Sequence, residues 1–383
     1  MKIAIATFVR AYNYGAVLQA YALNRVINEM GADCETVDYY PEYFNREYNM
    51  TELRRIKKPT IHIRSRIKSD LNNAKVYEKA QHRSRKFNRF IKKYIKLTKR
   101  TYRNLKELER SLPEYDAIIA GSDQIWRGGL TKFDTFFYLD FKLPEGTKKY
   151  SYAASFGFPE IDKEHEDDYR KKLSGYEKYS VREMSGVKIL YDLLGVNAAV
   201  NCDPVLLLNN EQWSEIASVK KEKGKYILLY SISYYSDFFQ FVSEYAKNTK
   251  LKVICVMCSM DTKTMLKTNF KRDGFDFDVR LCTSPEEFIS LFENAEYVMA
   301  ASFHGTLFSL LFHKNFTTLI SDKNGFKNNR AMEFLTETGL SNRGYIYGEA
   351  AQIQPVDSWE NADKKIQMMR DEAKEYIKSI LNH

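Results

Sequence analysis

The chain has 383 residues, of which 44% are hydrophobic and 28% charged, and its formal net charge is +9. This length predicts two domains, and the composition is that of a folded globular protein rather than a disordered one. No apolar run approaches the roughly 18 to 20 residues of a membrane span, and the short apolar N-terminus does not resemble a signal peptide, so we expect a cytoplasmic protein.

The first 40 residues alternate between strand and helix patterns. Residues 2–8 are an apolar run, a polar turn leads to helical spacing over 16–30, and Gly31 stands where a helix C-cap is expected. Another apolar run follows at 34–40. This order of strand, turn, helix and strand predicts a βαβ unit, with parallel strands and helices packed on the faces of the sheet.

A basic segment then interrupts the alternation. Between Arg54 and Arg110 there are 21 Lys and Arg residues against 4 Asp and Glu. Residues 74–97 place apolar residues on one helical face and basic residues around the rest. We interpret these residues as a surface helix whose basic face is solvated and whose apolar stripe packs against the rest of the protein. Contact with an anionic membrane is the second hypothesis, and nucleic acid is not expected as a partner because no recognition motif accompanies the charge.

The alternation resumes after the basic segment. Further strand patterns lie at 115–126, 148–157, 175–182 and 198–204. Residues 209–224 are polar and are interpreted as a hinge between domains. A second alternating half runs from 226 to 321, in which a helix is expected after Gly305, and residues 361–381 form an amphipathic helix.

These patterns predict an α/β protein with two Rossmann-like domains whose parallel sheets face each other across a cleft. The expected parts are an N-terminal domain at 1–210 with a basic helical insertion at about 52–110, a C-terminal domain at 223–358, and a helix at 359–383 that packs back on the N-terminal domain. Ligands of open α/β sheets bind beyond the carboxyl ends of the strands. We therefore expect the functional site in the cleft.

Polar residues follow the predicted strands in both halves, where a strand fixes the position of a side chain and the loop leaves it free. They are Asn13, Gly15, Ser122, Asp123, Gln124, Arg182, Glu183, Asp203, Ser302 and His304. Each residue alone has an ordinary structural interpretation as a turn cap, an ion pair or an internal hydrogen bond. Together they favour a polar binding site.

The ligand of this site is expected to be an anion. Gly305 directly after His304 indicates close backbone approach and a helix N-terminus, whose free amides attract negative charge. Arg182, Arg330 and Arg343 are available as cations.

Several common kinds of site lose support from the sequence. It contains no dinucleotide fingerprint, P-loop, zinc-protease motif or nucleophile elbow. Cys255 and Cys258 form a CxxC within or at the end of a strand pattern, and we interpret them as buried thiols because no second pair or histidine lies nearby. No dense cluster of carboxylates or histidines demands a metal, so neither a metal nor a resident cofactor is expected.

Six segments carry a more specific signal through their order and spacing: YNYGAVLQAYAL, YDAIIAGSDQIW, KYSYAASFG, YSVREMSG, NCDPVLLL and ASFHGTLFSLLFHKNF. In this combination the chain resembles the polysaccharide pyruvyl transferase family over roughly residues 1 to 345. The resemblance implies a fold similar to the GT-B glycosyltransferases. It also implies an enzyme that transfers pyruvate from phosphoenolpyruvate onto two hydroxyls of one sugar as a ketal, in a polysaccharide of the capsule or exopolysaccharide type or in a lipid-linked oligosaccharide.

The resemblance also assigns roles to residues. Relatives use an arginine at the SVRE position and a histidine at the HG position for the donor, which match Arg182 and His304, and an aspartate that matches Asp123. We expect these three to be catalytic. The residues expected to bind substrate are Asn13, Gly15, Ser122, Gln124, Asp203, Ser302, Gly305, Lys327, Arg330 and Arg343.

One departure from the family pattern concerns the donor phosphate. Relatives carry an arginine two residues before the histidine, and Ser302 stands at that position here. Lys327, Arg330 and Arg343 are therefore the candidates to supply the missing cation.

Two other functions are alternatives to pyruvyl transfer. A glycosyltransferase that uses a nucleotide sugar in the same two-domain cleft is the runner-up among enzymes, and a non-catalytic glycan-binding or assembly protein is the alternative from a different class. Because lipid-linked acceptors lie at the membrane, peripheral contact with its inner face through residues 74–97 is a secondary expectation.

Overall fold

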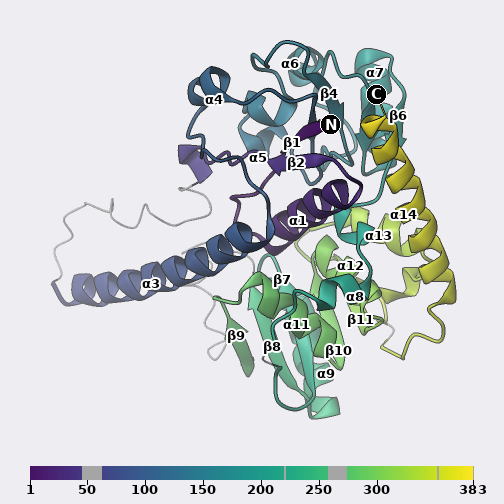
Figure 1. The fold of residues 1–383 in the computed structure, drawn as a ribbon. Coiled ribbons are helices and arrows are strands. Elements are labelled where there is room, and N and C mark those ends of the chain that lie inside the picture. The colour runs from purple at the N-terminus through teal and green to yellow at the C-terminus, as the bar shows by residue number, and fades with distance from the viewer. Residues whose placement is uncertain (45–62, 220, 258–273, 352, 383) are drawn as a thin grey trace. The chain divides into compact units, whose positions relative to one another are not determined.

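The computed structural model describes residues 1–44, 63–219, 221–257, 274–351 and 353–382 (Figure 1). The chain divides into two compact units. Unit 1 consists of Met1–Phe44, Ile91–Leu208 and Gln367–His383, and unit 2 consists of Asn45–Phe90 and Asn209–Ile366. Each unit is built around parallel strands, so the predicted α/β class with two Rossmann-like units is confirmed.

Unit 1 contains parallel strands in the order β2-β1-β3-β4. The strands are β1 (Lys2–Ala6), β2 (Asp33–Thr36), β3 (Ala117–Ala120) and β4 (Lys148–Ser151). β5 (Tyr179–Val181) and β6 (Ala198–Val200) pair with each other, and single bridges place β5 beside β4. The apolar runs of β1 and β3 are buried, as expected for parallel strands that are covered on both faces.

The helices of unit 1 connect these strands. They are α1 (Tyr14–Glu29), α4 (Leu105–Ser111), α5 (Gly128–Thr131), α6 (Glu166–Lys172), α7 (Met184–Leu194) and the 3-10 helices η2 (Thr135–Tyr138), η3 (Lys163–His165) and η4 (Pro204–Leu207). The second part of α14 (Glu360–Leu381) also belongs to unit 1. In this part Ile377 and Ile380 are fully buried, and the Tyr376 hydroxyl donates a hydrogen bond to the Ser151 carbonyl (2.9 Å).

Unit 2 contains parallel strands in the order β12-β11-β10-β7-β8-β9 among its described residues. They are β7 (Tyr226–Ser231), β8 (Lys252–Met257), β9 (Phe277–Arg280), β10 (Tyr297–Ala301), β11 (Asn315–Ser321) and β12 (Gly344–Ile346). The helices are α8 (Asn210–Ser214), α9 (Ser236–Thr249), α11 (Pro285–Asn294), α12 (Phe303–Leu311), α13 (Asn329–Glu337) and η5 (Ser341–Arg343). Counted along the chain, this strand order is 3-2-1-4-5-6, which is the Rossmann order.

Each sheet has a switch point, where successive connections leave in opposite directions. In unit 1 this point lies between β1 and β3, and in unit 2 it lies between β7 and β10. In open α/β sheets the loops after the strands at such a point diverge, and ligands bind there, at the carboxyl edge of the sheet. The chain segments after β1, β3, β7 and β10 are therefore where functional side chains are expected.

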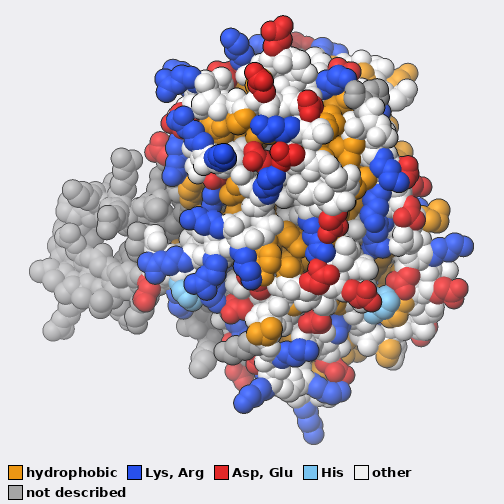
Figure 2. All heavy atoms as spheres, in the orientation of Figure 1, with side chains coloured by type: hydrophobic (Ala, Val, Ile, Leu, Met, Phe, Trp, Pro, Cys, Tyr) orange, Lys and Arg blue, Asp and Glu red, His pale blue; other side chains and the backbone are white. Residues whose placement is uncertain are grey.

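The basic helix α3 (Ile63–Tyr94) is docked on protein through its apolar stripe. Phe87 and Phe90 are fully buried. Arg83 is also buried, and its Nη1 donates to the carbonyls of Met257 (3.0 Å) and Leu281 (3.3 Å). The predicted docking of this helix is thus confirmed, whereas its contact with a membrane stays a prediction. Basic and acidic side chains are interspersed on the face in Figure 2.

Two further sequence predictions can be compared with the fold. The helix expected after Gly305 begins earlier, at Phe303, so that His304 and Gly305 lie in its first turn. Cys255 is a fully buried thiol in β8, and Cys258 lies outside the described residues. Within the described part of the chain, no helix is both long and apolar enough to cross a bilayer.

Candidate functional site

The first polar group at the switch point of unit 1 is the N-cap of α1. Asn13 follows β1 and has an extended backbone, and its side-chain oxygen accepts a hydrogen bond from the Ala16 amide (3.4 Å). Gly15 is buried in the first turn of the helix. Capping explains why Asn is favoured at this position.

Asp123 follows β3 and has an unusual backbone. Its φ is +73°, in the left-handed region, which is energetically unfavourable for any residue that has a side chain. The Asp123 carbonyl accepts hydrogen bonds from the amides of Ile125 (2.7 Å) and Ser155 (3.0 Å), and its carboxylate accepts one from the Gln124 amide (2.9 Å). The side chain remains 17% exposed, so the Asp123 carboxylate is both oriented by the backbone and accessible.

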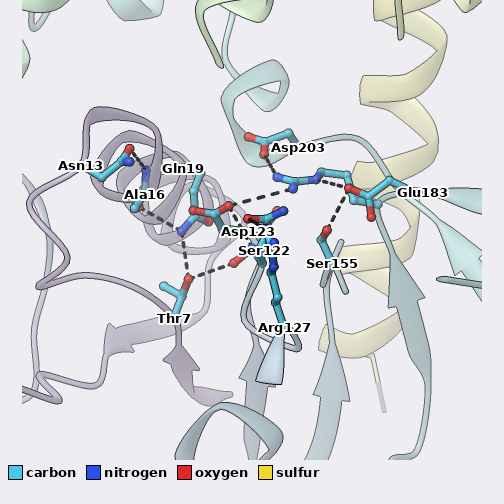
Figure 3. Close-up of polar contacts among 12 residues, drawn as sticks. Thr7, Asn13, Ala16, Gln19, Ser122, Asp123, Arg127, Ser155, Glu183 and Asp203 are labelled. Atoms are coloured by element: carbon cyan, nitrogen blue, oxygen red, sulfur yellow. Dashed lines mark hydrogen bonds and ion pairs between the residues drawn. The ribbon is translucent and has the colours of Figure 1, made fainter. Parts of the chain in front are cut away.

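A buried cluster of charges lies beside Asp123 (Figure 3). The guanidinium of Arg182, whose side chain is 3% exposed, lies 2.6 Å from the Asp203 carboxylate, 3.0 Å from Glu183 and 3.9 Å from Asp123. Burial alone would lower the pKa of Arg182, but Glu183, Asp203 and Asp123 outweigh it and hold the pKa above the ordinary arginine value. Arg182 therefore stays charged and organises three carboxylates.

The other members of the cluster are held by the protein as well. The second Asp203 oxygen accepts a hydrogen bond from the Val205 amide (3.0 Å), and this carboxylate is buried. Glu183 accepts a hydrogen bond from the Ser155 hydroxyl (2.9 Å). The Asp203 carboxylate thus anchors Arg182 in this structure, and its role in binding substrate stays a prediction.

The neighbours of Asp123 in sequence also lie at this edge of the sheet. Gln124 packs against Gly157, where an added Cβ would lie 2.2 Å from the Gln124 side-chain nitrogen. Ser122 is fully buried, and its carbonyl accepts a hydrogen bond from the Thr7 hydroxyl (3.1 Å). Gln19 of α1 donates to that same hydroxyl (2.9 Å). Gln19 and Thr7 are parts of the site that the sequence analysis missed.

In unit 2, His304 follows β10 at the start of α12. Ser302 is the N-cap residue, and its carbonyl accepts hydrogen bonds from the amide (3.1 Å) and hydroxyl (3.2 Å) of Thr306. His304 is largely buried in the first helical turn, where the aligned peptide dipoles favour negative charge. A Cβ on Gly305 would lie 2.9 Å from Tyr230, so glycine lets α12 approach β7 closely.

The three candidate cations of unit 2 lie in different places. The Arg330 guanidinium lies 5.4 Å from the ring centre of Phe303, the residue before His304. Lys327 is exposed, and its backbone forms an antiparallel β-bridge with Ser321 at the carboxyl end of β11. Arg343 is buried at the amino end of β12, where it donates to the carbonyls of Gln354 and Pro355.

In unit 1 the structure brings Asp123, Arg182 and Asp203 together. In unit 2, Arg330 lies near Phe303, the residue before His304, whereas Arg343 lies at the amino end of β12. The roles of all these residues in binding or catalysis stay predictions. Among the described residues, no group of three or more His, Cys, Asp or Glu side chains is arranged to hold a metal ion.

Fold and site together define a class: an α/β protein of two Rossmann-like units with polar side chains gathered at the switch point of each sheet, where such folds bind small ligands. The family described as polysaccharide pyruvyl transferase matches residues 13–323. The chain belongs to this family, which is a family of enzymes, and it is accordingly a sugar-modifying transferase. No curated protein shows a significant match.

Solved structures are similar to the chain at low identity. S. aureus MnaA, in a co-structure with UDP, is 12% identical, with a TM-score of 0.48 and coverage of 100% of this chain and 97% of that chain. The UDP-GlcNAc 2-epimerase of Methanocaldococcus jannaschii is 12% identical, with a TM-score of 0.45 and coverage of 100% and 99%. E. coli heptosyltransferase WaaC with ADP is 11% identical, with a TM-score of 0.41 and coverage of 97% and 99%.

Proposed function

We propose that the protein transfers pyruvate from phosphoenolpyruvate onto two hydroxyls of one sugar, in a polysaccharide or a lipid-linked oligosaccharide, and forms a pyruvate ketal. The observation that carries this proposal is the family match over residues 13–323. Phosphoenolpyruvate is the donor substrate, and the reaction needs no resident cofactor.

The chemistry defines what the protein must supply. The bond between the central carbon of the donor and the phosphate oxygen breaks, and two bonds from that carbon to sugar oxygens form. Of the two protons that the hydroxyls lose, the balance requires one on the methylene carbon, which becomes a methyl group, and one on the released phosphate. The reaction therefore needs an acid for carbon, a base for a hydroxyl, and positive charge for the donor anions.

His304 is assigned to the donor. Its place in the first turn of α12 supports contact with a phosphate or carboxylate, because backbone amides and the helix dipole both favour an anion there. An imidazole can also give or take a proton near neutral pH. His304 therefore acts as general acid or phosphate anchor, and Arg330 and Lys327 add positive charge in the same unit.

Asp123 is assigned to the acceptor. Its carboxylate is oriented, partly exposed and bound to the backbone of the next residue, which suits it to orient a sugar hydroxyl or to take its proton. The sequence predicts that Arg182 holds donor oxygens. Its close ion pairs with Asp203 and Glu183 favour a different role, in which Arg182 is fixed by these two carboxylates and in turn helps to hold Asp123 in place.

The test is incubation of the full chain with phosphoenolpyruvate and a galactoside, with measurement of phosphate release and detection of the ketal by mass spectrometry. In deuterated water, the new methyl group should carry deuterium, because the methylene carbon takes up a proton. His304→Ala should lower turnover by about 100-fold or more. His313→Ala is the matched control, because His313 is exposed and bonded to Asp363 (2.8 Å) in the same unit.

The alternatives predict other outcomes in the same assay. Transfer from a nucleotide sugar but not from phosphoenolpyruvate would identify a glycosyltransferase. Glycan binding with no transfer from either donor would identify a non-catalytic protein. Full activity of His304→Ala would exclude a proton-transfer role for that residue.

A further inference from the structure

We infer that Gln19 is a positioning residue that holds Asp123 in place through Thr7 and the Ser122 carbonyl. The inference rests on the proposed function, which gives Asp123 its role toward the acceptor. Gln19 lies in α1, Thr7 follows β1 and Ser122 follows β3, so the hydrogen-bond chain crosses the switch point of unit 1 (Figure 3).

The direction of this hydrogen-bond chain is fixed by its ends. The Gln19 side-chain nitrogen donates to the Thr7 hydroxyl (2.9 Å) and to the Ala16 carbonyl (2.9 Å). The Thr7 hydroxyl donates to the Ser122 carbonyl (3.1 Å). An amide nitrogen can only donate and a carbonyl can only accept, so the Thr7 proton must point at Ser122. Gln19 thereby determines which way the Thr7 hydroxyl points.

Asp123 needs such support because its backbone is strained. A residue with a side chain at φ +73° costs about 1–3 kcal/mol and persists only where its surroundings hold it. The Thr7 hydroxyl holds the carbonyl of the preceding peptide, and the Ser155 amide holds the carbonyl that follows (3.0 Å). These two contacts clamp the peptide groups on both sides of Asp123, and they fix where its carboxylate points.

A purely structural role for Gln19 makes different predictions. Gln19 is fully buried on α1, and any buried amide that loses its partners destabilises the fold. Asn24 provides a matched control on the same helix, because it is also buried and its side-chain nitrogen donates to the Thr36 hydroxyl (3.2 Å). The side-chain hydrogen bonds of Asn24 join it to Cys34, Thr36 and Lys96, away from the Ser122–Asp123 peptide, so its loss should affect stability alone.

The first experiment compares hydrogen exchange in Gln19→Met and Asn24→Leu with that in the wild-type chain. Both variants should lower Tm. Only Gln19→Met should raise exchange of the Gln124 and Ser155 amides, by about 10-fold or more, because these amides bond to Asp123. Equal exchange of these amides in the two variants would overturn the inference.

The second experiment measures kinetics with phosphoenolpyruvate and the galactoside. Gln19→Met should lower kcat by about 10-fold to 100-fold with little change in KM, as expected when a catalytic group is misplaced. Thr7→Val should have the same effect, and Thr7→Ser, which keeps the hydroxyl, should retain activity. In a chain that already carries Asp123→Asn, adding Gln19→Met should not lower kcat any further.

Independent effects of Gln19→Met and Asp123→Asn on kcat would show that Gln19 does not act through Asp123. If the wild-type chain transfers no pyruvate, the proposed function fails while the exchange experiment still decides whether Gln19 positions Asp123. The two ideas can thus fail separately.

Discussion

Replacing Arg182 with Met is expected to destabilise unit 1 strongly. The buried guanidinium lies 2.6 Å from Asp203 and 3.0 Å from Glu183, and the variant leaves both carboxylates and Asp123 without the cation that they share. Removing one partner of a buried ion pair costs about 3–5 kcal/mol. We expect a loss of about 4 kcal/mol, in the middle of this range.

This loss corresponds to a fall in Tm of roughly 8–16 °C for a unit of this size. Hydrogen exchange of peptides from β4 and β5 reports on unit 1 alone, and urea denaturation gives the free energy of unfolding. Lys188→Met is the matched control, because its ion pair with Asp192 is exposed, and it should leave the stability of the protein unchanged within error.

A double variant sharpens the test. Asp203→Asn keeps an oxygen that accepts the hydrogen bond of the Val205 amide but removes the charge. Arg182→Met combined with Asp203→Asn should therefore be more stable than the sum of the two single losses predicts. A loss of less than about 1 kcal/mol for Arg182→Met, or strictly additive effects, would refute the account of the charge cluster.

Three further predictions concern other parts of the chain. Gly305→Ala places a Cβ 2.9 Å from Tyr230, and overpacking of about 1–3 kcal/mol should outweigh the gain of about 1 kcal/mol in helix propensity; unchanged denaturation would contradict this. Burial alone would raise the pKa of Glu287, but its bonds to Lys86 and a backbone amide lower the pKa below the ordinary value of 4.5. These bonds to the charged carboxylate therefore stabilise the folded protein above about pH 4.5, and the stabilisation is lost as the pH falls further. Glu287→Gln should flatten the fall of Tm below about pH 5, and a slope equal to that of the wild type would exclude the effect. Burial raises the pKa of Cys202 to about 12, so maleimide at about pH 8 should label it only after denaturation, as peptide mass spectrometry can check.

The positions of Asp123 and His304 at strand ends followed from local sequence patterns. Apolar runs bounded by polar residues predict where a buried strand stops, and this information is contained in a few neighbouring residues. The sequence predicts a helix that begins after Gly305, but α12 begins a few residues earlier, at Phe303. Glycine instead lies in the first turn, where its small size allows close contact with Tyr230.

The partners of buried polar residues did not follow from the sequence. Arg182 and Asp203 are 21 residues apart, and nothing local indicates that they pair. Arg343 was predicted to bind the anionic substrate because it is a cation, yet its guanidinium binds backbone carbonyls that no sequence pattern marks. Gln19 carried one usable signal: it is a polar residue among buried apolar positions of α1, and a buried amide requires partners.

The place of residues 367–383 in unit 1 has a consequence for biosynthesis. During translation, the strands of unit 1 emerge from the ribosome well before this segment, and all of residues 209–366 are made in between. The surface that Ile377 and Ile380 cover stays open to water throughout that interval. Unit 1 thus cannot complete its packing until α14 has been synthesised, and its uncovered apolar surface is prone to aggregation in the meantime.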